Sequence, residues 1–378
     1  MRGLGEHVEG RREFHRQRLP IARAKLVEQA PNWERLAALA ADATRRMASP
    51  IEPLDVKHEA GPAPRDYRAI GTDGSQIEPD RHGIAEYSLI NMGWADLTYG
   101  AEPSAELGNR PHLYFKDEDL FISDGERRVP VQDGHLAAKR SVMELQWAAA
   151  LAESVTDPAI STVVLEDGTL LLWVLEQRPK DFIREQIFGE YVGYLTRLRE
   201  LQMPVASYIS RPRSTEVSGL LREATCRGEV ASCDGCGSFG GPCALEALHD
   251  RDLFWDLRAG QRSARFAVNL SGDVAAFYGD HRIHFFFIRI DDDEIARVEV
   301  PAWVATDEAA LDLVQSVVVD QCQRGLGYPV VIARSHEKAI VTGADRSVLR
   351  DMIEAQFARS GLYASSSAKQ ASKRVHAV

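Results

Sequence analysis

The sequence lacks any long apolar run. No stretch approaches the roughly 18 uncharged residues that a membrane-spanning helix requires. The first residues, MRGLGEHVEGRREFHRQ, contain no apolar segment of the kind found in secretion signals, and no internal repeat is present. These absences argue against membrane, secreted and repeat proteins, so we expect a cytoplasmic location with no membrane contact.

Positive charge is also in short supply. The chain has 45 Lys and Arg residues against 56 Asp and Glu residues, a formal net charge of −11. Because nonspecific attraction to nucleic acid comes mainly from Lys and Arg at phosphates, the overall charge opposes it. Contact with nucleic acid would need local basic patches, a partner or metal ions. The remaining composition, with 44% hydrophobic and 27% charged residues in 378, is that of a globular protein.

Cysteine is scarce except in one segment. Four of the five cysteines have the spacing C-x6-C-x2-C-x6-C, namely Cys226, Cys233, Cys236 and Cys243. A cytosolic chain rarely keeps disulfides, so the cluster favours a metal or free thiols. The central C-x2-C pair suits tetrahedral Zn²⁺, which would staple a loop with too little core of its own. An iron–sulfur cluster and metal-free thiols are the alternatives.

The order of elements predicts a mixed α/β or α+β core. Helix formers fill residues 1 to 48, and a proline-rich linker follows to residue 64. Helices are then expected near 135–155, 179–202, 306–324 and from 345. Strands are expected in the runs YRAIGTD, GIAEYSLINMGW, HLYFK, DLFIS, STVVLEDGTLLLW, MPVASYIS, RIHFFFIRI, IARVEVPAWVA and YPVVIARSH, with DDDE as a hairpin turn.

Two acids stand at strand ends in similar contexts. Asp73 and Asp167 each close an apolar run and are each followed by Gly and a hydroxyl residue. The chain has five Asp-Gly pairs, and most are expected to be turns. Side by side, two carboxylates would repel unless a cation or a shared proton joined them, and carboxylate oxygens suit Mg²⁺ or Mn²⁺. Two such ions would support phosphodiester hydrolysis.

Further ligands are needed for such a site. Glu144, on the helix before the Asp167 strand, is the candidate third acid, although an ion pair with Arg140 four residues earlier competes with that role. Glu166 is an alternative to Asp167, since neighbouring strand residues face opposite sides. His336 follows a predicted strand and is either a metal ligand or proton donor, or simply structural.

Seven segments in order resemble the NurA nucleases. They are AIGTDGSQ (69–76), RSVMELQWAAALA (140–152), VVLEDGTLL (163–171), VASYISRPRSTEV (205–217), DLRAGQRSARF (256–266), FFFIRIDDDEIARVEVPAWVA (285–305) and DQCQRGLGYPVVIARSHEKAIVTGADRSVL (320–349). The resemblance implies an RNase H-like, PIWI-like fold with a mixed central sheet flanked by helices. It assigns a nuclease domain to residues 65–360, within which the Cys-rich insertion (222–248) is not part of the family's minimal core. Composition adds a helical N-terminal arm and linker (1–64) and a disordered tail (361–378).

The resemblance also implies an activity and partners. These are a manganese-dependent nuclease with 5′-to-3′ exonuclease and single-strand endonuclease activity, a homodimer, and a hexameric HerA-type ATPase that assists in processing double-strand breaks. Asp73 and Asp167 match the family's strand-end ligands, Glu144 its helix acid and His336 its histidine, with two Mn²⁺ or Mg²⁺ ions expected. Ser335 stands where Ala is common in the family.

Substrate contacts are expected from a tyrosine and several arginines. Tyr208 lies in the YISRP segment, and the candidate phosphate contacts are Arg211, Arg213, Arg262 and Arg265. Concentrated there, positive charge would offset the acidic total. For each arginine, an exposed position or an ion pair with a nearby acid is the alternative. Two other functions stay open, a noncatalytic DNA-binding or scaffold subunit of a translocase and a phosphoesterase acting on small molecules.

Overall fold

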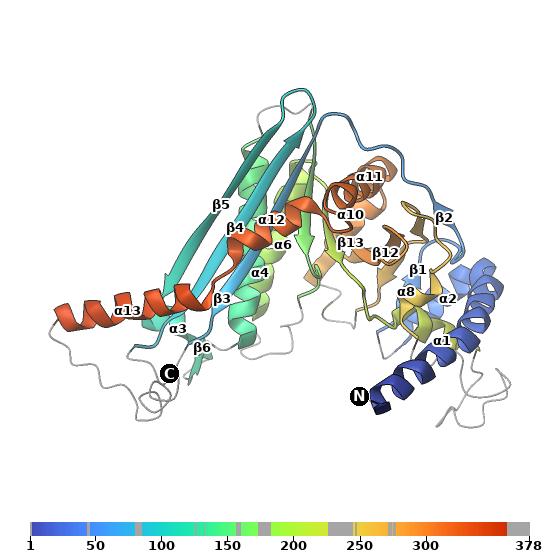
Figure 1. The fold of residues 1–378 in the computed structure, drawn as a ribbon, viewed down its shortest axis with the longest axis horizontal. Helices are drawn as coiled ribbons and strands as arrows, with labels where there is room; N and C mark the ends of the chain where they lie inside the picture. The colour runs from blue at the N-terminus through green and yellow to red at the C-terminus, as the bar shows by residue number, and fades with distance from the viewer. Residues whose placement is uncertain are drawn as a thin grey trace. The chain divides into compact units, whose positions relative to one another are not determined.

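The computed structural model describes residues 2–43, 46–79, 85–124, 127–131, 133–155, 160–172, 183–225, 245, 248–270, 274 and 277–360. These form two compact units, drawn in Figure 1. Unit 1 comprises Met1–Tyr67, Leu165–Leu171 and Pro204–Val330. Unit 2 comprises Arg68–Val164, Leu172–Met203 and Val331–Val378. The strand β8 (Ser161–Asp167) contributes residues to both.

Unit 1 combines helices of varied length with an antiparallel array of strands. Its strands follow the order β1-β11-β12-β13-β9, and β10 pairs with β12 and β2. The strands are β1 (Ala48–Pro50), β2 (Lys57–His58), β9 (Val205–Ile209), β10 (Arg262–Ser263), β11 (Phe266–Val268), β12 (Ile283–Arg289) and β13 (Ile295–Pro301). The helices are α1 (Arg2–Gln29), η1 (Ala30–Asn32), α2 (Trp33–Ala41), α7 (Glu216–Thr225), α8 (Asp250–Leu253), η5 (Gly279–His281), α10 (Ala302–Ala305) and α11 (Glu308–Arg324).

The core of unit 1 is built around the aromatic strand β12. Its side chains Phe285, Phe286 and Phe287 are fully buried, as expected for a strand covered on both faces. Phe287 stacks on Phe254 with ring centroids 4.9 Å apart, and Phe285 stacks on Phe266 at 5.4 Å. Such ring pairs add about 0.5–1.5 kcal/mol each beyond the area they bury. The predicted hairpin is confirmed, because β12 and β13 pair antiparallel.

Unit 2 contains the long strands of the molecule. The order β3-β4-β5 links β3 (Tyr67–Ile77), β4 (Ser88–Tyr99) and β5 (Ser104–Tyr114), and a separate hairpin joins β6 (Phe121–Asp124) to β7 (Arg127–Pro130). Its helices are α3 (Asp117–Leu120), α4 (Asp133–Glu153), the π-helix η3 (Ile183–Phe188), α6 (Gly189–Glu200), α12 (Val330–Ala339) and α13 (Gly343–Arg359).

Helix α4 packs on one face of these strands through a cluster of buried side chains. Ile90 and Met92 of β4 meet Leu136 and Met143 of α4, and Trp147 covers the cluster. Trp147 also stacks on Trp94 at a centroid distance of 4.7 Å. Apolar side chains recur at helical spacing on one face of α4 and pack it against the strands. The same helix carries Glu144.

The predicted α/β class, a sheet with flanking helices, is confirmed. The N-terminal region is helical as expected, through α1 and α2, and the helices expected near 306–324 and from 345 correspond to α11 and α13. One element was predicted wrongly, because residues 330–339 form helix α12 and not a strand. None of the helices in the described ranges is long and apolar enough to cross a membrane.

Candidate active site

Asp73 and His336 meet in unit 2. Asp73 lies on β3 and His336 on α12, and Asp73 Oδ2 is 2.7 Å from His336 Nδ1. An ionised carboxylate only accepts hydrogen bonds, so Nδ1–H of His336 is the donor. This bond leaves Nε2 as the second functional atom of the ring. The Asp73 side chain is 16% exposed and that of His336 is 60% exposed, so the pair opens to solvent on the histidine side.

Close backbone packing holds α12 against the strands. A Cβ atom added at Gly93 of β4 would lie 2.3 Å from the backbone nitrogen of Ala339, and one at Gly71 would lie 3.0 Å from the Val331 carbonyl oxygen. Asn91 donates to the Ala339 carbonyl at 2.8 Å, and the hydroxyl of Ser75 donates to the same oxygen. The glycines let α12 approach closely enough for His336 to reach Asp73.

Glu144 approaches β3 through α4. Its backbone carbonyl accepts from the Thr72 hydroxyl at 2.9 Å, and its Oε1 would lie 3.1 Å from a Cβ at Gly74. Because side chains alternate along a strand, position 74 faces α4 whereas Asp73 faces α12. The alternative foreseen from the sequence is present, since Arg140 Nε lies 3.3 Å from Glu144 Oε1.

Asp167 ends β8 within unit 1. Its side chain is exposed while that of its neighbour Glu166 is buried. Asp167 Oδ1 accepts a hydrogen bond of 2.8 Å from the hydroxyl of Tyr328. Tyr328 was not singled out as a site residue from the sequence. The one available signal was its place in the GYP segment, at the start of the predicted strand that leads to His336.

The donor set is chemically suited to Mn²⁺ or Mg²⁺, because carboxylate oxygens and an imidazole nitrogen are ordinary ligands of these ions. Among the residues that the structure describes, however, no group of three or more His, Cys, Asp or Glu side chains is gathered so that it could hold a metal ion. The predicted zinc ligands Cys226, Cys233, Cys236 and Cys243 lie outside the described residues, as does the predicted tail.

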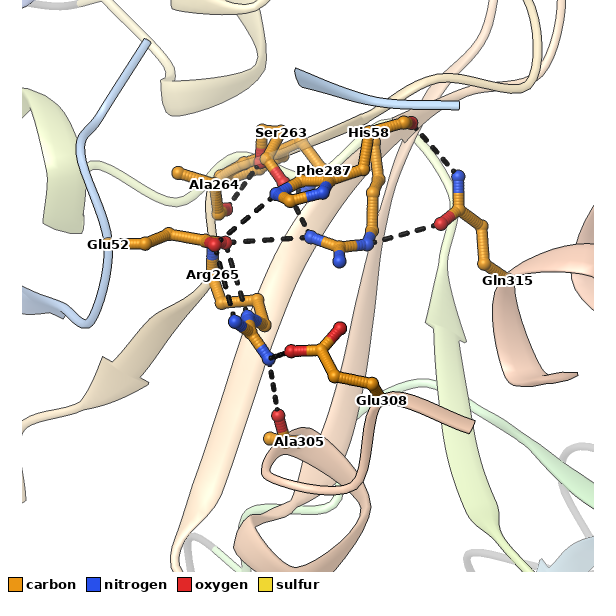
Figure 2. Close-up of polar contacts among 10 residues, drawn as sticks. Glu52, His58, Ser263, Ala264, Arg265, Phe287, Ala305, Glu308 and Gln315 are labelled. Carbon is orange, nitrogen blue, oxygen red and sulfur yellow. Dashed lines mark hydrogen bonds and ion pairs between the residues drawn. The ribbon is translucent and has the colours of Figure 1, made fainter. Parts of the chain in front are cut away.

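Two of the predicted arginine contacts are internal structural groups. Arg262 is 1% exposed, and its Nε donates to Gln315 Oε1 at 3.1 Å. Arg265 Nε donates to Glu52 at 3.2 Å, and Arg265 Nη1 donates to Glu308 at 3.0 Å. Figure 2 shows Glu52 at the centre of this network, with His58 on its other side. Acids and amides of unit 1 engage the guanidinium groups of Arg262 and Arg265, and their role as phosphate contacts stays a prediction.

Burial and neighbouring charges shift the pKa values of Glu52 and His58 in this network. Desolvation raises the pKa of Glu52, but hydrogen bonds from Arg265 outweigh it, so the pKa lies below its ordinary value. Burial also lowers the pKa of His58, aided by the positive charge of Arg262, so His58 is neutral near pH 7. The network thus sets two arginines, Arg262 and Arg265, against two carboxylates, Glu52 and Glu308.

The remaining predicted contacts differ in exposure. Tyr208 is fully buried and packs edge-to-face against Tyr328 with ring centroids 5.4 Å apart. Arg211 is exposed, although its Nε lies 3.3 Å from Glu294. Arg213 is also exposed. These two arginines are the members of the predicted set that present charge to solvent.

Comparison with known proteins identifies the family. Residues 67–341 match the NurA domain. A search of curated proteins finds no match. Similar solved structures include a NurA crystal structure, with 8% identity over 85% of this chain and 95% of that one, at a TM-score of 0.41. LC9-RNase H1, a type 1 RNase H with the type 2 active-site motif, shares 10% identity over 39% of this chain and 64% of that one, at 0.19. Drosophila Piwi shares 8% identity over 71% of this chain and 28% of that one, at a TM-score of 0.24.

The NurA domain match extends from the first strand of unit 2 to the end of α12. It includes Asp73, Glu144, Asp167 and His336 and covers well over half of the chain. The chain therefore belongs to the NurA domain family.

Proposed function

We propose that this protein is a Mn²⁺- or Mg²⁺-dependent deoxyribonuclease with 5′-to-3′ exonuclease and single-strand endonuclease activity. Family membership points to a nuclease of the NurA type. The observation that carries the proposal is the 2.7 Å contact between Asp73 and His336, which come from positions 263 residues apart. An ordered carboxylate–imidazole pair open to solvent is suited to proton transfer during phosphodiester hydrolysis.

In this proposal, Asp73 orients the His336 ring. By accepting the Nδ1 proton, the carboxylate fixes the tautomer and aims Nε2 outward, where it can take a proton from a nucleophilic water or return one to the leaving oxygen. The carboxylates that would hold the metal ions are Asp73, Glu144 and Asp167. His336 would use the one lone pair of Nε2 either for proton transfer or as a further metal ligand. When bound, the metal supplies Lewis-acid stabilisation of the phosphodiester and a more acidic water.

The proposed partners rest on family membership. A homodimer and a HerA-type hexameric ATPase acting in double-strand break end processing are the expected assembly. Copurification of tagged protein with a HerA-type ATPase from the native host tests the partner, and mass by light scattering tests the dimer. A monomer that binds no such ATPase would contradict this part of the proposal while leaving the nuclease assignment intact.

The substitution Asp73→Asn tests the activity. The variant should keep its fold and lose cleavage of labelled single-stranded DNA in Mn²⁺, because amide oxygen carries no charge to balance a cation or an imidazolium. Asp293→Asn is the matched control, since Asp293 is exposed in the β12–β13 turn. Full cleavage by Asp73→Asn would sink the assignment. Wild-type protein that binds DNA without cutting it would favour a noncatalytic subunit, and cleavage of a small phosphodiester alone would favour a phosphoesterase.

The cysteine segment is proposed to bind one structural Zn²⁺ through Cys226, Cys233, Cys236 and Cys243, in the tetrahedral thiolate set that zinc prefers. Protein purified without added zinc should contain one equivalent of zinc and show no absorbance band near 400 nm. A visible band with iron present would identify an iron–sulfur cluster instead. Metal-free protein of full stability would support free thiols.

A further inference from the structure

The loop that follows Asp167 is tied to a buried carboxylate. Glu299 of β13 is 1% exposed, and its Oε2 accepts from the Thr169 hydroxyl at 2.7 Å and from the Leu170 backbone N–H at 3.0 Å. The Thr169 hydroxyl in turn accepts from the Leu171 N–H at 3.1 Å. All these residues belong to unit 1, as Asp167 does.

A buried arginine holds Glu299 in place. Arg297 is 2% exposed, and its Nη2 lies 2.8 Å from Glu299 Oε1. Side chains two positions apart on a strand share a face, which brings this pair together on β13. Arg297 also pairs with Glu216, and its guanidinium lies 3.6 Å from the centre of the Phe285 ring. A buried ion pair with several partners is costly to rearrange, so Glu299 is a fixed acceptor.

Further hydrogen bonds fix the same loop. Gly168 adopts φ +83°, and its N–H donates to the Tyr208 carbonyl at 3.2 Å. The Leu170 carbonyl accepts from the hydroxyl of Tyr278 at 3.1 Å. The three residues after Asp167 are therefore each held by a partner on another element. A turn on the protein surface does not need this many hydrogen bonds to buried polar groups.

We propose that Glu299, held by Arg297 and acting through Thr169 and Leu170, is a positioning residue that sets the direction of the Asp167 carboxylate. The inference rests on the proposed function, in which Asp167 belongs to the catalytic set. It explains why the loop DGTL is anchored at the residues after the acid, while the acid itself stays exposed for substrate or metal. A small displacement of such a group costs rate even when binding is unchanged.

Thr169 gives a clean test, because its side chain is exposed and lies outside the core. Thr169→Val keeps the shape but removes the hydroxyl that donates to Glu299, whereas Thr169→Ser keeps the hydroxyl. We expect Thr169→Val to lower kcat about 10- to 100-fold with KM for single-stranded DNA and the melting temperature nearly unchanged. Thr169→Ser should restore most of the rate. Glu299→Gln is the second variant, since it removes the charge but keeps the volume.

Amide hydrogen exchange provides a readout that does not depend on activity. The Leu170 N–H should exchange faster in Thr169→Val and in Glu299→Gln than in the wild type, while β13 amides away from the loop stay protected. A merely structural role for Glu299 would instead lower the melting temperature and protein yield with kcat per folded molecule unchanged.

The substitution Asp167→Asn tests the proposed role of Asp167 separately from the positioning role of Glu299. If that variant keeps full activity, the proposed role of Asp167 fails and the positioning role fails with it. If Asp167→Asn is inactive while Thr169→Val matches the wild type in kcat and in Leu170 exchange, the positioning inference alone is overturned.

Discussion

At the scale of single residues, the proposed function gives the two nitrogens of His336 separate roles. Nδ1 binds Asp73, and Nε2 is left for substrate or metal. His336→Asn places an amide nitrogen near the Nδ1 position, so the bond to Asp73 can persist while Nε2 is lost. We expect a folded variant whose Mn²⁺-dependent cleavage of single-stranded DNA falls at least about 100-fold, the usual effect of losing an acid–base group.

Glu337→Gln is the matched control for this experiment, because Glu337 is the next residue of α12, is exposed, and pairs only with Arg334 among the described contacts. Exposed pairs contribute little to stability, so this variant should behave as the wild type. Wild-type cleavage by His336→Asn would show that the ring serves only to pair with Asp73.

His284 links stability to pH through burial. Its side chain lies on β12 and is 8% exposed. Burial, followed by the positive charges of Arg282 and Arg265, lowers the pKa of His284 from 6.5 to about 4. The folded state thus binds this proton less tightly than the unfolded state. Protonation of His284 in the unfolded state therefore lowers the free energy of unfolding as the pH falls from 6.5 towards 4. Above pH 6.5 the ring is neutral in both states, and this loss is absent.

The resulting loss should be about 2 to 3 kcal/mol of unfolding free energy between pH 7.5 and 4.5. Urea unfolding at both values measures it, and in His284→Gln the difference between the two values should shrink by that amount. Comparing the variant with the wild type cancels the contributions of other titrating groups. An unchanged pH dependence in His284→Gln would contradict the assignment.

At the scale of elements, α12 illustrates how tertiary packing overrides local preference. The run Val330, Val331, Ile332 is β-branched and predicts a strand. In the structure the buried positions of this helix are Val331, Ile332, Ser335 and Ala339, which is helical spacing. The sequence pattern was visible, but the glycines that make room for the helix lie about 240 residues earlier, beyond the reach of local interpretation.

Gly93→Ala should therefore disturb α12 without changing any site residue. The added Cβ would lie 2.3 Å from the Ala339 nitrogen and 2.5 Å from the Ser335 carbonyl oxygen, so the helix must move. We expect a stability loss of about 1–3 kcal/mol by urea unfolding, typical of an overfilled core. Nuclease activity per folded molecule should also fall, because α12 carries His336.

Gly343→Ala is the control for this substitution. Gly343 begins α13, and a Cβ there would meet nothing within 4 Å. Alanine is also the better helix former, so stability should stay the same or rise slightly. Equal behaviour of the Gly93 and Gly343 variants would mean that α12 adapts and that its close approach is not required.

At the scale of the whole molecule, the sequence suggested candidate site residues, but the contacts around them became visible only in the structure. The family pattern assigned Asp73 and His336 to one predicted site despite their separation, and the structure adds a direct contact of 2.7 Å between them. The internal partner of Arg262 and Arg265 could not be predicted, because Glu52 precedes Arg265 by 213 positions and no local sequence pattern shows such a contact. Tyr328 was overlooked because its role appears only when its hydroxyl meets Asp167.

In a chain of net charge −11, the four arginines predicted to contact phosphates lie in different structural settings. Arg211 and Arg213 are exposed, whereas Arg262 is 1% exposed and bonded within unit 1. If the exposed pair contacts phosphates, each loss should reduce the slope of log affinity against log salt by about 0.7 for single strands. The double variant Arg211→Gln, Arg213→Gln should therefore show a slope smaller by about 1.4.

Binding is best measured in the Asp73→Asn background, where cleavage does not interfere. Arg262→Gln serves as the contrast, because breaking a buried pair with Glu52 should cost about 3 kcal/mol of unfolding free energy and leave the salt slope unchanged. If Arg262→Gln changed the slope without loss of stability, the arginine would have to turn out of its network to reach DNA. An unchanged slope in the double variant would mean that neither exposed arginine contacts phosphate. Binding of DNA by this acidic protein would then depend on metal ions or on a partner.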